Sequence, residues 1–278
     1  MGQQKRDEIS LWRDSQLHGG MEILQATCYE HSYPPHFHDE FVIAAFARGA
    51  QRTRVCRQNG IAAAGSVMII APGEVHTGEA VQRDEGWDYC AFYPGEKLIY
   101  EVAQTVLSGK GDVNFGLQGI RHDPLMARRM LHAASVMKQS PDPLEKECVM
   151  YQILNVLVGH YGERTVKGSR QSVLRADIRK AIAFLHSAYA QPLTVKEIAQ
   201  VAGLSEFYFM RTFQKMTGLS VHQYLTQIRL MRAKGLLARG MGAAQVASDI
   251  GFFDQSHLIK QFRAHFDTTP GMFAAASM

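Results

Sequence analysis

The spacing of hydrophobic positions changes along the chain, and the change predicts two structural classes. In the first hundred residues, short stretches rich in β-branched and aromatic residues are separated by turn formers such as Pro34-Pro35, Asn59-Gly60 and Pro72-Gly73. The stretches are residues 21–30, 40–48, 51–57, 66–71 and 87–93. Short strands divided in this way predict an all-β barrel or jelly roll, with Asn59-Gly60 forming a tight hairpin turn.

Further along the chain, apolar residues recur every three to four positions, which is typical of helices. Residues 124–138 and 144–159 follow this period on either side of Ser140-Pro-Asp-Pro143, so we expect a helical hairpin. Its apolar stripe packs either on the barrel or on a second subunit. The polar segment that follows predicts a linker. The predicted organisation is therefore a barrel over residues 1–110, a dimerisation hairpin over 111–160, a linker over 161–172 and an all-α domain over 173–278.

Composition supports a folded protein of this size. The chain has 278 residues, of which 46% are hydrophobic and 20% are charged, so it can form two cores and is unlike a disordered chain. No stretch approaches the roughly 18 apolar residues of a spanning helix, which predicts no membrane partner. The four cysteines are widely separated, with no CxxC pair. Reduced thiols and the absence of an apolar N-terminal segment predict a cytoplasmic location.

Charge is distributed unevenly between the predicted domains. From residue 161 onward there are 15 Lys and Arg against 7 Asp and Glu, a net charge of +8. The first 160 residues have 15 against 19, a net charge of −4, and the two values sum to the total of +4. A basic helical domain favours an anionic partner, most often nucleic acid. The alternative is a solvated domain that is merely basic.

An internal repeat is the most informative feature of the sequence. Ala199 and Gly203 recur as Ala247 and Gly251, 48 residues later. After one extra residue in the second copy, further matches are Ser205 with Asp254, Phe209 with Leu258, Arg211 with Lys260, and Phe213 with Phe262. Each copy thus has a short helix, a glycine turn, a candidate N-cap and an amphipathic second helix. This pattern predicts two helix-turn-helix units.

The second helix of each unit has an apolar stripe that predicts which side chains face outward. Phe209 and Phe213, and likewise Leu258 and Phe262, are four residues apart and form the buried stripes. The predicted DNA-binding residues lie on the opposite faces: Glu206, Phe207, Met210, Arg211, Gln255, Ser256, His257 and Lys260. Arg and Lys pair with guanine and Gln with adenine, whereas Phe207 and Met210 would contact thymine methyl groups. A solvated face is the alternative for Arg211 and Lys260.

A long helix is predicted between the two units, with Arg229, Arg232 and Lys234 on its outer face. Such a helix is a rigid spacer. It would let the two units enter major-groove segments about one turn apart on the same side of a duplex.

Residues from about 176 to 273 resemble the DNA-binding domain of the AraC/XylS family of bacterial transcription regulators. The similarity is carried by Leu193-Thr-Val-Lys-Glu-Ile-Ala199, Gly251-Phe-Phe-Asp-Gln-Ser-His-Leu258 and Phe262-Arg-Ala-His-Phe-Asp-Thr-Thr-Pro270. The chain departs from the family pattern at Asp267, where glycine is usual, and at Ala274, where a basic residue often stands. The resemblance implies a transcriptional activator that binds double-stranded DNA, forms a homodimer and contacts RNA polymerase.

The barrel contains two histidine motifs. Pro35-His-Phe-His-Asp-Glu40 and Gly65-Ser-Val-Met-Ile-Ile-Ala-Pro-Gly-Glu-Val-His76 are similar to the halves of a cupin motif, as in the sensor domains of many AraC-type regulators. We expect a ligand pocket formed by His36, His38, Glu40 and His76, with an aromatic wall from Trp87 or Tyr89. The glutamate that metal-binding cupins place after the second histidine is missing. A small-ligand pocket, a metal site at His36, His38 and His76, and structural hydrogen bonding remain open.

The function predicted from these patterns is a ligand-responsive, sequence-specific DNA-binding regulator with a small-molecule effector in the barrel. It is predicted to have no catalytic residues and no cofactor. The rival hypothesis is a metal-dependent cupin enzyme with an appended helical domain.

Overall fold

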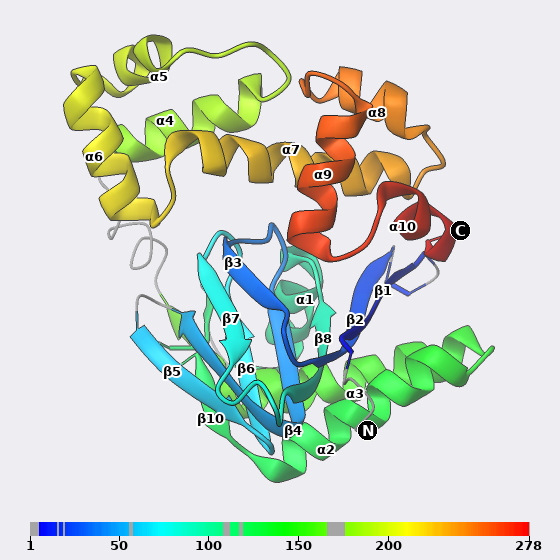
Figure 1. Ribbon diagram of the computed structural model, residues 1–278. Coiled ribbons are helices and arrows are strands. Elements are labelled where there is room, and N and C mark those ends of the chain that lie inside the picture. Colours follow the sequence, from blue (N-terminus) through cyan, green and yellow to red (C-terminus); the bar gives the residue numbers. More distant parts are fainter. Residues whose placement is uncertain are drawn as a thin grey trace. The chain divides into compact units, whose positions relative to one another are not determined.

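The chain forms two compact units, residues 1–167 and 168–276. The computed structural model describes residues 6–15, 17–18, 20–55, 58–107, 112–116, 119–165 and 176–277. Within these ranges, no helix combines the length and the apolar character needed to cross a membrane. The first unit combines a β-barrel with helices, and the second is helical (Figure 1). The predicted all-β barrel followed by an all-α domain is confirmed.

An antiparallel sheet forms the body of the first unit. Its main path runs in the order β1-β2-β8-β4-β6-β10, while β3 pairs with β7, and β4 also pairs with β5 and β7. A separate pair joins β9 and β11. The strands are β1 (Glu8–Asp14), β2 (Met21–Cys28), β3 (Ser32–His36), β4 (Val42–Val55), β5 (Gln58–Ala63), β6 (Ser66–Ile70), β7 (His76–Ala80), β8 (Trp87–Tyr93), β9 (Asp112–Asn114), β10 (Ile120–His122) and β11 (Glu163–Thr165).

The central strands are buried on both faces, which explains their near-continuous apolar sequences. On β4, Ile43 and Ala45 join the core that the sheet shares with the helices, while Val42 and Ala44 line the barrel interior. On β8, Cys90 and Phe92 face the helical core in the same way. Because side chains alternate along a strand, the neighbouring Tyr89, Ala91 and Tyr93 face inward.

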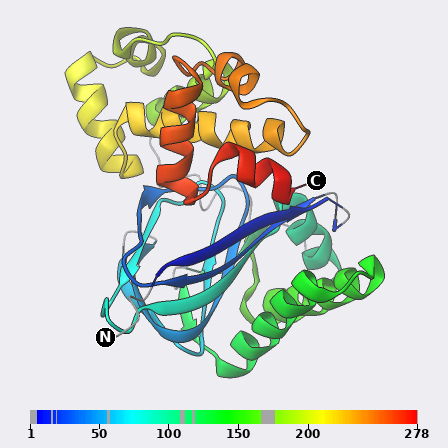
Figure 2. The same ribbon diagram turned by 45° about the vertical axis from the view of Figure 1, so that its right-hand side comes forward.

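Three helices cover one side of this sheet: α1 (Glu96–Val106), α2 (Pro124–Gln139) and α3 (Pro143–Tyr161). Figure 2 shows α2 and α3 side by side next to the barrel, and α2 contacts β4, β6 and β8. The predicted hairpin is thus present. Asp123 and Asp142 cap its helices by accepting hydrogen bonds from the N–H groups of Met126 and Leu144. Most of the apolar stripe, including Met130, Met137 and Leu154, packs in the core that the hairpin shares with the barrel, whereas Leu125 stays exposed on the outer face.

Several predicted details of the first unit are wrong. Residues 40–48 and 51–57 belong largely to one long strand, β4. Asn59 and Gly60 are not the hairpin turn, because Val55 pairs with Gln58 and places them inside β5. Gly60 serves close packing instead, since a Cβ there would lie 2.7 Å from Cδ1 of Ile120. Helix α1 was not predicted. Part of the predicted linker forms β11, and residues 166–172 lie outside the described residues.

The second unit consists of α4 (Ala176–Ala188), α5 (Val195–Ala202), α6 (Glu206–Thr217), α7 (Val221–Leu237), α8 (Ala243–Asp249), α9 (Gln255–Phe266) and α10 (Pro270–Ala276). Helix α7 runs between the α5–α6 pair and the α8–α9 pair (Figure 1). It packs on helices of both pairs, so one long helix joins the two cores of this unit.

Candidate functional site

The barrel gathers the three predicted histidines into one cluster. Strand pairing places His36 at the end of β3 opposite His76 at the start of β7. His38 follows β3, and its ring centroid lies 5.0 Å from that of His36 and 5.3 Å from that of His76. One ring nitrogen from each histidine lies within 4.8 Å of the other two. This cluster, which we call the histidine triad, is thus assembled from two strands that are far apart in sequence.

Hydrogen bonds orient two rings of the triad. Nδ1 of His36 lies 2.8 Å from the carbonyl oxygen of Pro34, and Nδ1 of His76 lies 3.0 Å from that of Glu74. A carbonyl oxygen only accepts, so each Nδ1 carries a proton, and in the neutral ring Nε2 presents a lone pair. Burial lowers the pKa of His76 to about 4, so that ring is neutral at pH 7. A neutral Nε2 can bind a transition metal ion or accept a hydrogen bond from a ligand.

Tyrosines and β-strand side chains enclose the space beside the triad. The cavity has a volume of about 40 Å³ and is bounded by Tyr33, His36, His38, Val42, Ala44, Gln51, Met68, His76, Thr77, Gly78, Tyr89, Ala91 and Tyr93. The Tyr89 hydroxyl donates to that of Tyr33 at 2.8 Å, and the Tyr93 ring lies 5.0 Å from His38. No lysine or arginine lines this cavity among the residues that the structure describes. Its polar groups are therefore imidazoles, phenols, an amide and a hydroxyl, beside apolar side chains such as Val42 and Met68.

Two of the predicted pocket residues lie elsewhere. Trp87 is fully buried and does not line the cavity, although its ring lies 6.4 Å from that of Tyr89. Glu40 lies in the bend before β4 and is also absent from the lining. Tyr33 and Tyr93 line the pocket but were not predicted. Alternation along β8 would have indicated Tyr93, since it lies four residues from Tyr89 on the same face.

Both helix-turn-helix turns have the predicted left-handed glycine. Gly203 has φ of 70° and Gly251 has φ of 82°. Ala199 and Ala247 are each 1% exposed, which lets the paired helices approach closely. The N-caps differ, because the Asp254 carboxylate accepts from the backbone N–H of His257 at 2.7 Å, whereas the Ser205 side chain makes no capping hydrogen bond.

The second helices, α6 and α9, expose most of the predicted DNA-binding residues. We call these two the recognition helices. Phe209 and Phe213 on α6, and Leu258 and Phe262 on α9, are fully buried. The opposite faces expose Glu206, Phe207, Met210, Arg211, Gln255, Ser256 and Lys260. His257 is the exception, since it is half-buried with its ring 5.0 Å from that of Phe252.

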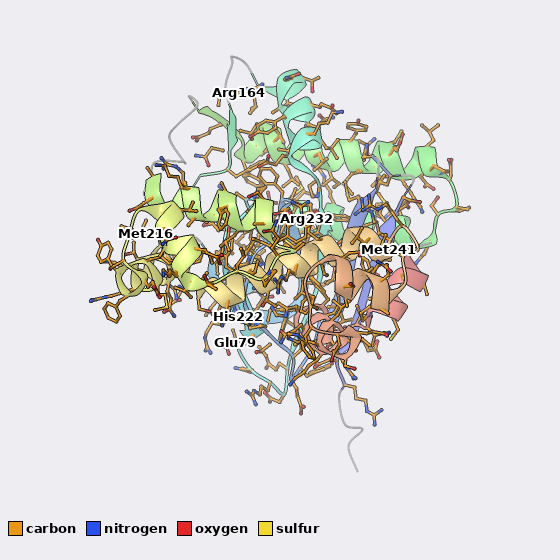
Figure 3. The ribbon with its side chains drawn as sticks, turned by 90° about the horizontal axis from the view of Figure 1, so that it is seen from above. Glu79, Arg164, Met216, His222, Arg232 and Met241 are labelled. Carbon is orange, nitrogen blue, oxygen red and sulfur yellow. The ribbon has the colours of Figure 1, made fainter. Side chains whose placement is uncertain are left out.

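The cations of α7 do not form the exposed row predicted for them. Lys234 is only 7% exposed, and its Nζ lies 4.7 Å from the centre of the Phe266 ring. Arg229 donates from Nε to the carbonyl oxygen of Tyr189 at 2.8 Å. Arg232, which Figure 3 labels on α7, is exposed and lies over the Tyr189 ring. All three cations therefore contact another segment of the unit, and of the three only Arg232 is exposed.

Family comparison agrees with this two-part architecture. A family model described as an AraC-like ligand binding domain matches residues 18–154, and one described as a helix-turn-helix domain matches residues 198–276. The first match contains the histidine triad, and the second contains both recognition helices. This chain belongs to the AraC family of transcriptional regulators.

Relatives of this AraC-family regulator match nearly all of its length. An uncharacterized HTH-type transcriptional regulator of Bacillus subtilis, YbfI, is 28% identical over 252 residues, covering 90% of this chain and 89% of YbfI. The Msm operon regulatory protein of Streptococcus mutans is 24% identical and covers 87% of each chain. The family thus supplies the general function: the regulator responds to a ligand and binds DNA in a sequence-specific manner.

Solved structures show the same fold over the whole AraC-family chain. An apo ToxT variant from Vibrio cholerae has a TM-score of 0.58 at 12% identity and covers 99% of both chains. Wild-type ToxT bound to an unsaturated fatty acid has a TM-score of 0.54 at 12% identity, covering 96% of this chain and 94% of ToxT. At this level of identity the similarity concerns the fold alone.

Proposed function

We propose that this regulator binds duplex DNA through the outward faces of both recognition helices and holds a small effector beside the histidine triad. The proposal of DNA binding rests on one observation: both recognition helices expose hydrogen-bond donor side chains on the face opposite a buried apolar stripe. Arg211 on α6 and Lys260 on α9 occupy matching positions and are both exposed. Guanine offers the acceptors that such cations recognise in the major groove.

The test is a binding measurement on an operator selected from random duplexes by the full-length protein. Arg211→Ala and Lys260→Ala should each weaken binding to that operator by about 1–3 kcal/mol, with a smaller loss on random duplexes. Lys97→Ala is the matched control, because Lys97 is a 91% exposed cation of the first unit. Equal losses on both kinds of DNA would assign the two cations to phosphate contact. A protein that selects no operator would contradict the proposal.

The chemistry of the pocket favours an uncharged effector that donates hydrogen bonds. His76 is a neutral acceptor, and the cavity lining among the described residues includes no lysine or arginine that would pair with a carboxylate. Small polyols and similar hydroxylated molecules fit this character. Because the volume is only about 40 Å³, a larger metabolite would require movement of lining side chains.

Melting temperatures of the full chain with matched ligand pairs test this preference. A small polyol should raise the melting temperature more than the carboxylic acid with the same carbon skeleton, since ligand binding stabilises the folded state. His38→Ala should remove the shift. Stabilisation by the carboxylates alone would contradict an uncharged effector.

A divalent transition metal ion is a second candidate occupant, favoured by the grouping of three imidazole nitrogens within 4.8 Å. Imidazole suits zinc, copper, nickel and iron, and neutral Nε2 is the usual ligand atom. Titration of chelator-treated protein with Co²⁺ should produce visible absorption that His36→Ala and His76→Ala abolish. His222→Ala is the control, because His222 is an exposed histidine of α7 (Figure 3). Absorption unchanged by the triad variants would exclude this site.

We also infer the less specific features of the regulator from its family. It acts as an activator without catalytic activity, in the cytoplasm, as a homodimer that contacts RNA polymerase. The metal-dependent enzyme considered from the sequence has no support among the relatives above, which are regulators.

Exposed Leu125, Leu144 and Tyr151 on the α2–α3 hairpin support this hairpin as the dimer contact. Sedimentation of Leu144→Glu should show a weaker dimer than the wild type.

A further inference from the structure

The two most exposed large hydrophobic residues of the described chain both lie at the start of a recognition helix. Phe253 is 93% exposed and Phe207 is 74% exposed, above all others in this class. Phe207 is the second residue of α6, and Phe253 directly precedes Asp254, the N-cap of α9. A helix-turn-helix presents this end of its second helix to the bases. Phe253 was not among the DNA-binding residues predicted from the sequence.

Neither side chain is required by the core of its own unit. The adjacent Phe252 takes the buried position in the second turn, where its ring packs on His257 at 5.0 Å. On α6 the buried positions belong to Phe209 and Phe213. An aromatic side chain left almost wholly in water stabilises the fold little, so the apolar surface of Phe207 and Phe253 is available to a binding partner.

The surroundings indicate that this partner is DNA. Exposed Arg211 and Lys260 lie on the same two helices, and the chain has a net charge of +8 from residue 161 onward. The one apolar group that base edges present in the major groove is the C5-methyl of thymine. Each recognition helix thus has an apolar side chain at its start and a cation further along. The major groove offers a matching partner for each, because thymine methyl groups lie between the two anionic backbones.

We propose that Phe207 and Phe253 each contact a thymine methyl group, so that the operator carries two methyl-dependent positions about one helical turn apart. This inference rests on the proposed binding of DNA by α6 and α9, and it adds Phe253 as a specificity-determining residue. Met210, exposed one turn further along α6, extends the apolar contact in the first unit.

Replacement of thymine by deoxyuridine in the selected operator tests this directly, because it removes only the methyl group and keeps the base pair. We expect single replacements at two positions to weaken binding about four-fold each, the effect of one buried methyl group. Phe253→Ala should weaken binding to the thymine operator and abolish the deoxyuridine effect at one position only. Phe207→Ala should do the same at the other.

The control variant is Met272→Ala, which shortens a 66% exposed apolar side chain on α10 and should leave both deoxyuridine effects intact. Persistence of both effects in Phe207→Ala and Phe253→Ala would overturn the inference. So would an equal loss by Phe253→Ala on every duplex, which indicates backbone contact. Unchanged DNA binding with reduced transcription would assign Phe253 to a protein partner. If wild-type protein selects no operator, the proposed DNA binding itself fails, and this outcome is distinct from the others.

Discussion

Gly203 and Gly251 provide a comparison in which the backbone conformation is the same and the surroundings differ. Both have positive φ, where an L side chain costs about 1 kcal/mol. A Cβ at Gly203 would meet nothing within 4 Å. A Cβ at Gly251 would lie 2.6 Å from the carbonyl oxygen of Ala190 and 3.0 Å from Nη2 of Arg229. The carbonyl belongs to the backbone, so it cannot give way without moving the segment that joins α4 to α5.

The expected destabilisation follows from these contacts. Gly203→Ala should lower the free energy of unfolding of the second unit by about 1 kcal/mol, the conformational cost alone. Gly251→Ala adds an overpacking cost of about 1–3 kcal/mol, giving about 2–4 kcal/mol in total. It also disturbs Arg229, which donates to the carbonyl oxygens of Tyr189 and Gln191, so the link between α7 and the segment that joins α4 to α5 is weakened.

Urea unfolding of the full chain can separate the two units. Both tryptophans, Trp12 and Trp87, belong to the first unit, so their emission reports on the barrel. A loss of helical circular dichroism without a change in emission therefore reports on the second unit. We expect the midpoint of this helical transition to fall clearly more for Gly251→Ala than for Gly203→Ala. Equal midpoints for the two variants would refute the steric reasoning.

Two further comparisons concern the caps of the recognition helices and can be measured in the same unfolding experiment. Asp254→Ala should destabilise the second unit by about 1 kcal/mol, because it removes the N-cap hydrogen bond of α9. Ser205→Ala should have a much smaller effect, because the Ser205 side chain makes no capping hydrogen bond. Equal effects of the two substitutions would contradict the capping assignment. Asp267 ends α9 with φ of 51°, so Asp267→Gly should stabilise the unit by about 0.5–1 kcal/mol and Asp267→Ala should not.

Much of the second unit was predictable because its pattern is local and occurs twice. The spacing of Ala, Gly and apolar residues predicts where both recognition helices lie, because the apolar stripe of a helix consists of residues only three or four positions apart. Lys234 shows the limit of this reasoning. Its place on the outer face of α7 follows the helical period, yet α9 and α10 cover that face with Phe266 and Phe273.

In the first unit, composition was a weaker guide because sheet pairing is non-local. Glu163–Thr165 is polar enough to predict a linker, but its backbone pairs with β9, and backbone hydrogen bonds do not require apolar side chains. Asn59-Gly60 has strong turn propensity, yet the register of β4 and β5 pairs Asn59 with Arg54 and Gly60 with Thr53, inside the two strands. Helix α1 was missed because strand-like segments surround it.

The order of the two domains, the paired helix-turn-helix units and the identity of the three histidines could all be predicted from the sequence. All of these depend on short-range spacing or on residue chemistry. Other features became visible only in the folded chain. His36, His38 and His76 lie close together, and Tyr33 and Tyr93 line the cavity beside them, whereas Trp87 and Glu40 do not. Phe253 is exposed to solvent. These features depend on strand register and on which surfaces the neighbouring elements cover. Strand register and surface coverage both result from contacts between residues that are far apart in the chain.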